Sequence, residues 1–144
     1  VRFFNKYGPG EWYHPFRSVN CLFTYNLLHK KPITVFKGHS RTSTYIYDSV
    51  RTLANIADNF IDGETYNIAS DQEHTIENLA ELLVKYTKAD PALVDYREHS
   101  EVLTTKHKHV DASKSVRDLD HKNTVSLEEG VWETVQWMKE HYRL

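Results

Sequence analysis

An apolar stretch at residues 1–4 runs almost directly into the triplet Gly8-Pro9-Gly10. Proline fixes its own φ and lacks an amide hydrogen, whereas glycine reaches positive φ without strain. The triplet therefore predicts a tight turn that closes a short strand, and it argues against a long helix at the start of the chain.

Beyond this turn, short strands alternate with helices, and there is no internal repeat or long linker. Strands are expected where β-branched and aromatic residues gather, at residues 1–4, 33–36, 44–47, 65–69, 93–96 and 107–110. Helices are expected where apolar residues recur at helical spacing, at residues 16–30, 48–59, 76–90 and 126–142. The pattern predicts a small mixed α/β fold, with residues 1–144 as one domain.

Three helix starts carry recognisable signals. Asp48 is expected to cap the helix that follows it, and Thr75 to cap the next one. Ser126 and Glu129 have the spacing of a capping box, in which each side chain satisfies an amide at the helix start. The apolar stripes of these helices are interpreted as core positions.

Composition excludes several classes of protein. The chain has 144 residues, 40% of them hydrophobic, which is enough for one core. A formal net charge of −2 argues against nucleic acid or an anionic membrane as the main partner. The lone Cys21 cannot form an internal disulfide, and no apolar run is long enough to cross a bilayer, so a cytoplasmic protein is expected. Because Val1 already lies in an expected strand, we expect a fragment of a larger protein.

The sequence lacks the usual parts of a catalytic or cofactor site. Its five glycines lie at positions 8, 10, 38, 63 and 130, so neither a Gly-x-Gly-x-x-Gly loop nor a Walker loop can form. No tyrosine is followed four residues later by lysine. We therefore expect no catalytic residue in this chain.

Two polar residues are candidates for gripping a phosphorylated ligand. The carboxamide of Asn5 follows the first strand, and Arg41 precedes a strand. A guanidinium can meet two phosphate oxygens at once through charge-assisted hydrogen bonds. The alternatives are that Asn5 bonds to its own turn backbone and that Arg41 pairs with Asp48 or Glu64.

Two further features remain open. Arg17 faces either a nucleotide or only water. His107 and His109 would share one face of a strand, a spacing that suits a metal, but no third ligand is evident and we expect no metal site.

Several segments of the sequence resemble one family, the extended short-chain dehydrogenase/reductases. Its members include NAD-dependent nucleotide-sugar epimerases and dehydratases such as dTDP-glucose 4,6-dehydratase. The first segment, residues 2–9, resembles the family's Arg-Tyr-x-Asn-x-Tyr-Gly-Pro strand and turn. Five further segments resemble segments of the family and follow in the same order. The first three are Lys31-Pro32 with the apolar strand after it, Arg41 to Asp48, and Gly63 to Ile68. The last two are Asp111-Ala112-Ser113-Lys114 and residues 125–137, which contain the pattern Leu-Glu-Glu-Gly-x-x-x-Thr-x-x-Trp. The resemblance covers nearly the whole chain but only the C-terminal half of such an enzyme.

The resemblance implies that an N-terminal Rossmann domain, largely absent from this chain, holds NAD and supplies the catalytic tyrosine and lysine. It implies that Asn5 and Arg41 bind the diphosphate of a nucleotide sugar, and that Phe3 lies beside the nicotinamide. The whole enzyme is then expected to be a homodimer that oxidises the sugar at C4 before elimination or inversion. The chain alone is expected to be inactive.

The chain also departs from the family. A second diphosphate arginine is usual about ten residues before Asp-x-Ser-Lys, but Glu101 stands there, and Lys106 is the nearest expected substitute. An inserted turn carries Trp12, Tyr13, His14 and Arg17. Two other classes stay open: a stand-alone, non-catalytic module that binds a phosphorylated ligand, and an interaction domain whose residues 12–16 dock a partner protein.

Overall fold

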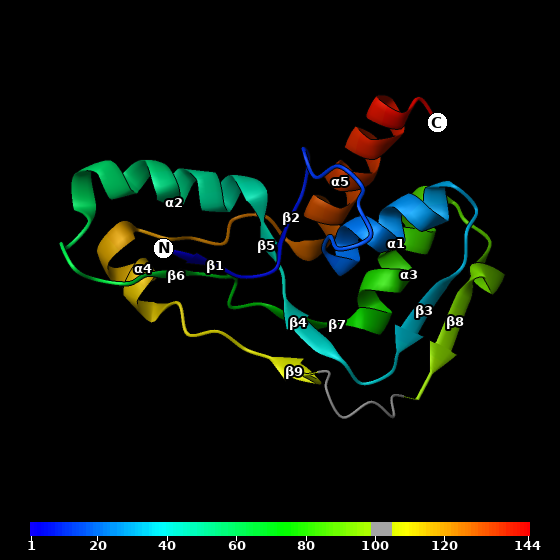
Figure 1. Cartoon of the computed structure of the whole chain (residues 1–144), viewed down its shortest axis with the longest axis horizontal. Helices are drawn as coiled ribbons and strands as arrows, with labels where there is room; N and C mark the ends of the chain where they lie inside the picture. The colour runs from blue at the N-terminus through cyan, green and yellow to red at the C-terminus, as the bar shows by residue number, and fades with distance from the viewer. Residues whose placement is uncertain (99–104) are drawn as a thin grey trace.

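A computed structural model describes residues 1–98 and 105–144 (Figure 1). The helices are α1 (Val19–Leu28), α2 (Ile46–Asn59), α3 (Ile76–Thr87), α4 (Ser113–Leu119) and α5 (Leu127–Tyr142), with a 3-10 turn η1 (Pro91–Leu93). The strands are β1 (Arg2–Phe3), β2 (Lys6–Tyr7), β3 (Ile33–Phe36), β4 (Ser40–Thr42), β5 (Thr44–Tyr45), β6 (Asn67–Ile68), β7 (Glu73–Thr75), β8 (Val94–Arg97) and β9 (His107–Lys108). The expected mixed α/β architecture is confirmed.

The main core lies where α1 and α3 pack against β3, which pairs in parallel with β8, and where α5 packs against α1 and α3. Its buried apolar side chains are Tyr7, Leu27, Ile33, Val35, Tyr45, Ile76, Leu79, Ala80, Leu83, Val131 and Val135. The apolar stripes predicted for α3 and α5 do form this core, because each helix buries the face that carries its stripe. The stripe expected to be core in α2 is not, since Val50 is 50% and Leu53 41% exposed.

Two predicted helix starts are confirmed. The Thr75 hydroxyl accepts a hydrogen bond from the Asn78 amide at 3.1 Å, so Thr75 caps α3. At α5, the Glu129 amide donates to the Ser126 hydroxyl at 3.2 Å, and the Ser126 amide donates to the Glu129 carboxylate at 3.0 Å. Both bonds of a capping box are therefore present.

The cap expected at Asp48 is wrong. The strand expected at residues 44–47 ends at Tyr45, and α2 begins at Ile46, so Asp48 lies inside the first turn. Its buried carboxylate instead accepts hydrogen bonds from the amides of Thr124 at 3.0 Å and Val125 at 3.3 Å and from the Thr124 hydroxyl at 2.6 Å. Asp48 thus ties α2 to the segment that leads into α5.

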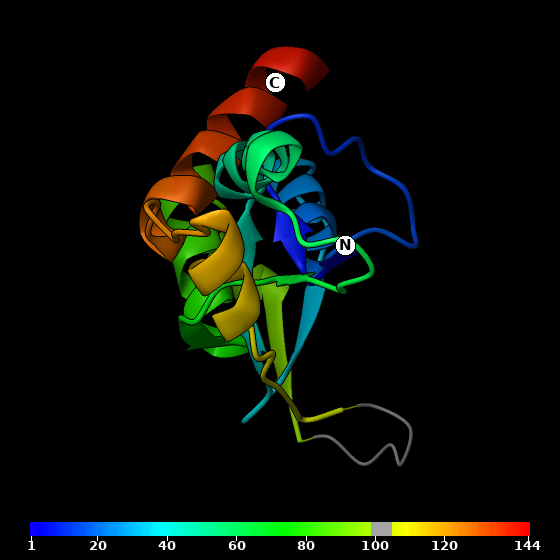
Figure 2. The same ribbon diagram turned by 90° about the vertical axis from the view of Figure 1, so that its left-hand side faces the viewer.

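Small strands join the main core to the far end of the molecule. β2 pairs with β5 in parallel, and β4 lies between β7, which is antiparallel to it, and β9, which is parallel to it. At the far end, β1 and β6 form a parallel pair, with α2 on one side and α4 on another (Figures 1 and 2). No helix of the described residues is long and apolar enough to cross a membrane.

Candidate functional site

Arg41 lies on β4, and its guanidinium is held by backbone. Nη1 donates to the carbonyl of Ser40 at 2.6 Å and to that of Lys106 at 3.1 Å. The expected alternative ion pairs do not form, since Asp48 pairs with Arg51 and Glu64 pairs with Lys114. Within residues 1–98 and 105–144, no carboxylate forms a salt bridge with Arg41, and partial burial lowers its pKa. Of the groups that the structure describes, none is recorded as accepting the remaining guanidinium hydrogens, which are the ones that an anion would meet.

A cavity of about 210 Å³ opens beside Arg41. It is lined by Val19, Phe23, Thr34, Phe36, His39, Arg41 and Ile76. The rings of Phe36 and His39 lie 6.0 Å apart with a 41° angle between their planes. The cavity is smaller than the roughly 300–1,000 Å³ of a typical site for a whole ligand, so it suits one moiety of a larger molecule. Apolar rings with a cation at the wall suit a flat heterocycle joined to an anion.

Asn5 adopts a left-handed backbone conformation, with φ of 48°. Its carbonyl accepts a hydrogen bond from the Thr44 amide at 3.1 Å, and its Nδ2 donates to the carbonyl of Thr42 at 3.3 Å. The carboxamide therefore bonds across to β4, the strand of Arg41, rather than to its own turn. Nδ2 carries a second hydrogen, which is the group that can donate to a phosphate oxygen, and ligand contact by Asn5 stays a prediction.

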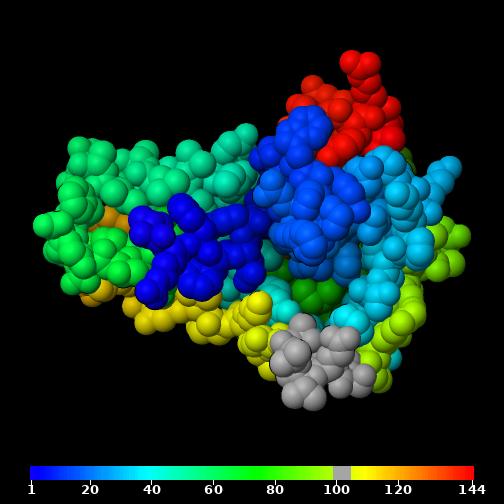
Figure 3. Space-filling model, in the orientation of Figure 1, coloured from blue at the N-terminus to red at the C-terminus, as the bar shows by residue number. Residues whose placement is uncertain are grey.

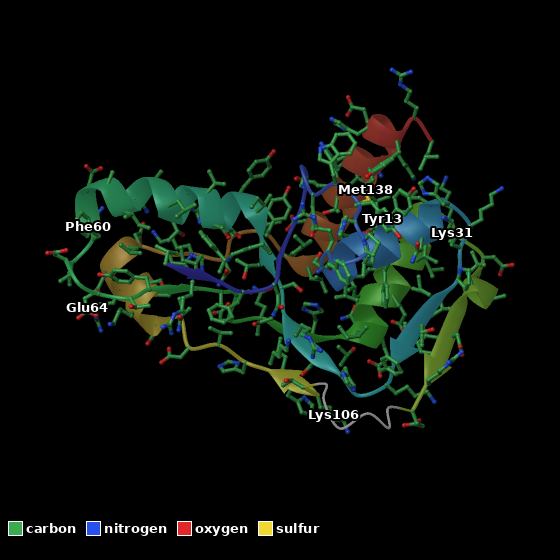
Figure 4. The ribbon with its side chains drawn as sticks, viewed as in Figure 1. Tyr13, Lys31, Phe60, Glu64, Lys106 and Met138 are labelled. Atoms are coloured by element: carbon green, nitrogen blue, oxygen red, sulfur yellow. The ribbon has the colours of Figure 1, made fainter. Side chains whose placement is uncertain are left out.

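Lys106 lies beside the turn that precedes β4 (Figure 4). A methyl group added at Gly38, whose φ is 69°, would come within 3.4 Å of Lys106 Cε. The Lys106 carbonyl supports Arg41, and its side chain is exposed. The structure thus brings Lys106 next to Arg41, as a substitute cation requires, although its ligand role is a prediction. Glu101, where the family arginine was expected, lies outside the described residues.

Phe3 lies on β1 with 47% of its surface exposed. Lys6 Nζ lies 5.4 Å from the centre of the Phe3 ring and donates to the carbonyl of Ile68 at 2.7 Å. Burial lowers the pKa of Lys6 to about 7, and the charge of Asp48 opposes that shift. The predicted contact of Phe3 with a nicotinamide is untested.

Arg17 is not part of the Arg41 cavity. It is exposed and lines a separate hollow of about 310 Å³ together with the turn at Gly8-Pro9-Gly10. The turn is closely packed, since a Cβ at Gly8 would lie 3.2 Å from side-chain atoms of Ile46 and Tyr45. A nucleotide contact by Arg17 would require a ligand that spans both cavities.

The aromatic segment at residues 12–16 packs mostly on its own chain. The Trp12 ring lies 5.3 Å from that of Trp137, and Tyr13 stacks on Tyr25 at 3.8 Å. The Tyr13 amide also donates to the Tyr142 hydroxyl at 2.8 Å. Only Phe16, at 91% exposure, projects fully into solvent. Trp12 and Tyr13 therefore serve chiefly to fix the inserted turn to α1 and α5. In Figure 3, the surface of the N-terminal segment (blue) lies against that of the C-terminal helix (red).

A buried polar cluster beneath β4 was not found from the sequence. Asn20 Nδ2 donates to the Ser43 hydroxyl at 3.2 Å, and His74 Nε2 lies 3.2 Å from the same oxygen. Burial and, less strongly, the charge of Arg41 lower the pKa of His74 to about 4. His74 is therefore neutral near pH 7 and adds no second charge beside Arg41. These residues are far apart in the sequence, and no spacing rule links them.

His107 is engaged with β4 rather than with its neighbouring histidine. Its Nδ1 lies 2.8 Å from the Ser40 hydroxyl. Across the part of the chain that the structure describes, no three His, Cys, Asp or Glu side chains group as metal ligands.

No family model matches the chain. Curated relatives do match it along nearly its whole length. It is 29% identical to the UDP-N-acetyl-alpha-D-glucosaminuronate decarboxylase of Bacillus cytotoxicus, over 97% of this chain and 46% of that protein. It is 30% identical to the dTDP-glucose 4,6-dehydratase of Salmonella typhimurium, over 92% of this chain and 38% of that protein. The chain thus spans less than half the length of these relatives.

Solved structures agree. An epimerase from Methanothermobacter thermautotrophicus superposes with a TM-score of 0.88 at 29% identity, covering 99% of this chain and 43% of that one. The UDP-glucuronic acid 4-epimerase of Bacillus cereus, solved with UDP-glucuronic acid and NAD, gives a TM-score of 0.81 at 26% identity, covering 98% and 45%. Along nearly its whole length, the chain is therefore similar to the C-terminal portion of extended short-chain dehydrogenase/reductases, among them nucleotide-sugar epimerases and dehydratases.

Proposed function

We propose that this chain is the substrate-binding part of an NAD-dependent nucleotide-sugar epimerase or dehydratase, and that it grips the nucleotide diphosphate of the sugar. The observation that carries this proposal is the guanidinium of Arg41 at the wall of the cavity formed by Phe23, Phe36 and His39, with no carboxylate salt bridge among the described residues. In that arrangement the heterocyclic base enters the cavity and the diphosphate meets Arg41.

The remaining predicted contacts are placed around this centre. Asn5 is bonded to Thr42, the neighbour of Arg41 on β4, and Arg41 donates to the carbonyl of Lys106, so we assign both residues to the same diphosphate. Arg17 lies in a separate hollow and is assigned to a more distant part of the substrate.

NAD and the chemistry at C4 are assigned to the part of the relatives that this chain does not span. Relatives of known structure contain NAD together with UDP sugars, as in the Bacillus cereus epimerase. This chain then contributes orientation of the sugar and exclusion of water. Homodimerisation of the whole enzyme, a cytoplasmic location and a single domain over residues 1–144 stay predictions.

The test is nucleotide binding measured by titration calorimetry with UDP, dTDP, GDP and CDP. We expect the pyrimidine diphosphates to bind, since the cavity of about 210 Å³ is narrow. Arg41→Ala removes hydrogen bonds to a charged group, worth about 1.5–3 kcal/mol, and should weaken binding roughly 10- to 150-fold.

Arg143→Ala is the matched control, because Arg143 is an exposed arginine at the end of α5. It should leave the affinity unchanged. Equal affinity of Arg41→Ala and the native chain, or no binding to the native chain at millimolar nucleotide, would contradict the proposal. Binding of inorganic pyrophosphate as tightly as UDP would instead favour the general phosphoryl-ligand module.

A further inference from the structure

Lys108 is the neighbour of Arg41 on the outer strand of the three-stranded sheet. The strand order is β7-β4-β9, and Arg41 pairs with His74 on one side and with Lys108 on the other (Figure 1). Paired residues of neighbouring strands direct their side chains to the same face of a sheet. His74, Arg41 and Lys108 therefore form a row across one face, which we call the β4 row.

The carboxylates next to this sheet are bonded elsewhere. The Ser40 hydroxyl donates to Glu73 and lies 2.8 Å from Nδ1 of His107. Alternate residues of a strand point to opposite faces, so these three side chains lie on the face away from the β4 row. In the first turn of α3, Glu77 accepts a hydrogen bond from the Gly38 amide at 2.6 Å.

The β4 row and the adjacent Lys106 carry positive charge without a paired carboxylate. Among the residues whose positions are described, Arg41, Lys106 and Lys108 form no salt bridge. Both lysines are exposed, and His74 is neutral near pH 7 because burial lowers its pKa to about 4. Like charges opposite each other across a sheet are destabilising, so Arg41 and Lys108 together favour an anionic ligand.

The three cations lie at different distances from the cavity beside Arg41. The cavity is lined by His39, just before β4, and so lies at the start of that strand. Lys106 reaches the same end, since its side chain lies against Gly38. Because β9 runs parallel to β4, Lys108 lies two residues, or about 6–7 Å, farther from that end.

This order of cations matches the order of groups in a nucleotide sugar. With the base in the cavity, Arg41 and Lys106 meet the diphosphate, and the sugar continues along β9 towards Lys108. We propose that this sugar is a hexuronic acid and that Lys108 pairs with its carboxylate. The substrate class is thereby narrowed, on the basis of the proposed function, to nucleoside diphosphate sugars that carry a further anionic group.

A lysine on an edge strand also has a use that involves no ligand. Charged side chains at an edge discourage pairing with a strand of another molecule. That use is served by a charge of either sign at residue 108, whereas recognition of a carboxylate needs a positive one. Substitutions of Lys108 therefore separate the two roles.

The experiment compares UDP-glucuronic acid with UDP-glucose by titration calorimetry of this chain. The two ligands differ only in the group at C6 of the sugar, so the ratio of their affinities isolates the contribution of the carboxylate. We expect UDP-glucuronic acid to bind about 3- to 10-fold more tightly, which lies between an exposed ion pair and a hydrogen bond to a charged group.

The variants test whether Lys108 is the cause of this preference. Lys108→Met should bring the two affinities to within about twofold of each other, because it removes the charge and keeps a long side chain. Lys108→Glu should reverse the preference, since its carboxylate repels that of the sugar, and it keeps a charge on the edge strand. Lys31→Met is the matched control and should keep the native ratio, because Lys31 is an exposed lysine far from Lys106 (Figure 4).

The outcomes separate this proposal from the one on which it rests. Equal affinities of the native chain for both sugars, with both weakened by Arg41→Ala, would overturn the hexuronic acid and leave the proposed function standing. A native preference that persists in both Lys108 variants would overturn the role of Lys108. If neither sugar nor UDP bound to the native chain, the proposed function would be wrong, and the hexuronic acid with it.

Discussion

His74 shows how one buried side chain can make the stability of this chain depend on pH. It shares the Ser43 hydroxyl with Asn20 and lies opposite Arg41 in the β4–β7 register. Protonation of the His74 imidazole costs free energy, because the ring is buried and the positive charge of Arg41 lies nearby. The folded chain therefore holds this imidazole neutral.

The pH dependence has a definite sign. The pKa of His74 is lowered to about 4 from an ordinary value of 6.5, so between these values the unfolded chain binds more protons. The free energy of unfolding should fall as the pH drops through this window, by about 3 kcal/mol for His74 at 1.36 kcal/mol per pH unit. His121, whose pKa burial also lowers, adds in the same direction.

Urea unfolding of His74→Gln at pH 7 and pH 5 checks this prediction. Glutamine is uncharged at both, so the difference in unfolding free energy between the two pH values should shrink. His14→Gln, at an exposed position, should keep the native difference. If the unfolding free energy of His74→Gln depended on pH as strongly as that of the native chain, His74 would not be the cause of this dependence.

Gly130 illustrates a packing constraint at a single position. It lies in α5, where alanine would ordinarily stabilise the helix by about 1 kcal/mol. An added Cβ, however, would contact the Tyr7 hydroxyl and lie 2.8 Å from Tyr45 Cδ2. We expect Gly130→Ala to lower the unfolding free energy by about 1–3 kcal/mol, measured by chemical denaturation.

The Tyr7→Phe change provides the control for Gly130→Ala, because it removes the hydroxyl nearest to the new methyl group. In the double variant, part of the loss should be recovered. Additive losses would mean that the clash is not the cause.

At the scale of elements, α2 owes its place to Asp48. Truncation to Ala leaves the Thr124 amide and hydroxyl and the Val125 amide without their acceptor. Thr124 is exposed and Val125 is half-buried, so water can replace part of the lost bonding, and Asp48→Ala should lower the unfolding free energy by about 1–3 kcal/mol. Asp58→Ala, on the exposed side of α2, should change it little, and equal losses for both variants in a denaturation experiment would contradict this role.

The same residue shows what the sequence could and could not reveal. Local signals sufficed for Thr75 and Ser126, because a cap bonds within three residues of itself. Asp48 was misassigned because its partners lie 76 and 77 residues away. Strands β4 and β7 and helix α4 were missed since each is too short to show a period.

The residues of the candidate site likewise fall into those that the sequence suggested and those that it did not. Asn5 and Arg41 were proposed from residue type and from their positions, after one expected strand and before another. Phe23 and Phe36 were not, because an aromatic residue in a helix or strand looks like core until folding places it beside a cavity. Lys106 was chosen only as the nearest cation, and its position next to Arg41 depends on the β4–β9 pairing.

At the scale of the whole molecule, the expectation that this chain alone is inactive can be tested directly. The sequence has no dinucleotide-binding loop and no Tyr-x-x-x-Lys pair. We expect no NADH formation when this chain is mixed with NAD and UDP-glucose, with a complete UDP-glucose 4-epimerase in the same assay as the positive control. Turnover that disappears with Arg41→Ala would show that this chain carries a catalytic site.

The aromatic contacts between the inserted turn and α5 have a consequence for spectroscopy. Trp132 and Trp137 belong to α5, and Trp12 packs on Trp137. Tryptophan fluorescence therefore reports on this end of the molecule alone, whereas circular dichroism also senses α2 and α4. If the β1–β6 end melts first, the ellipticity will change while the emission spectrum of the indoles stays constant.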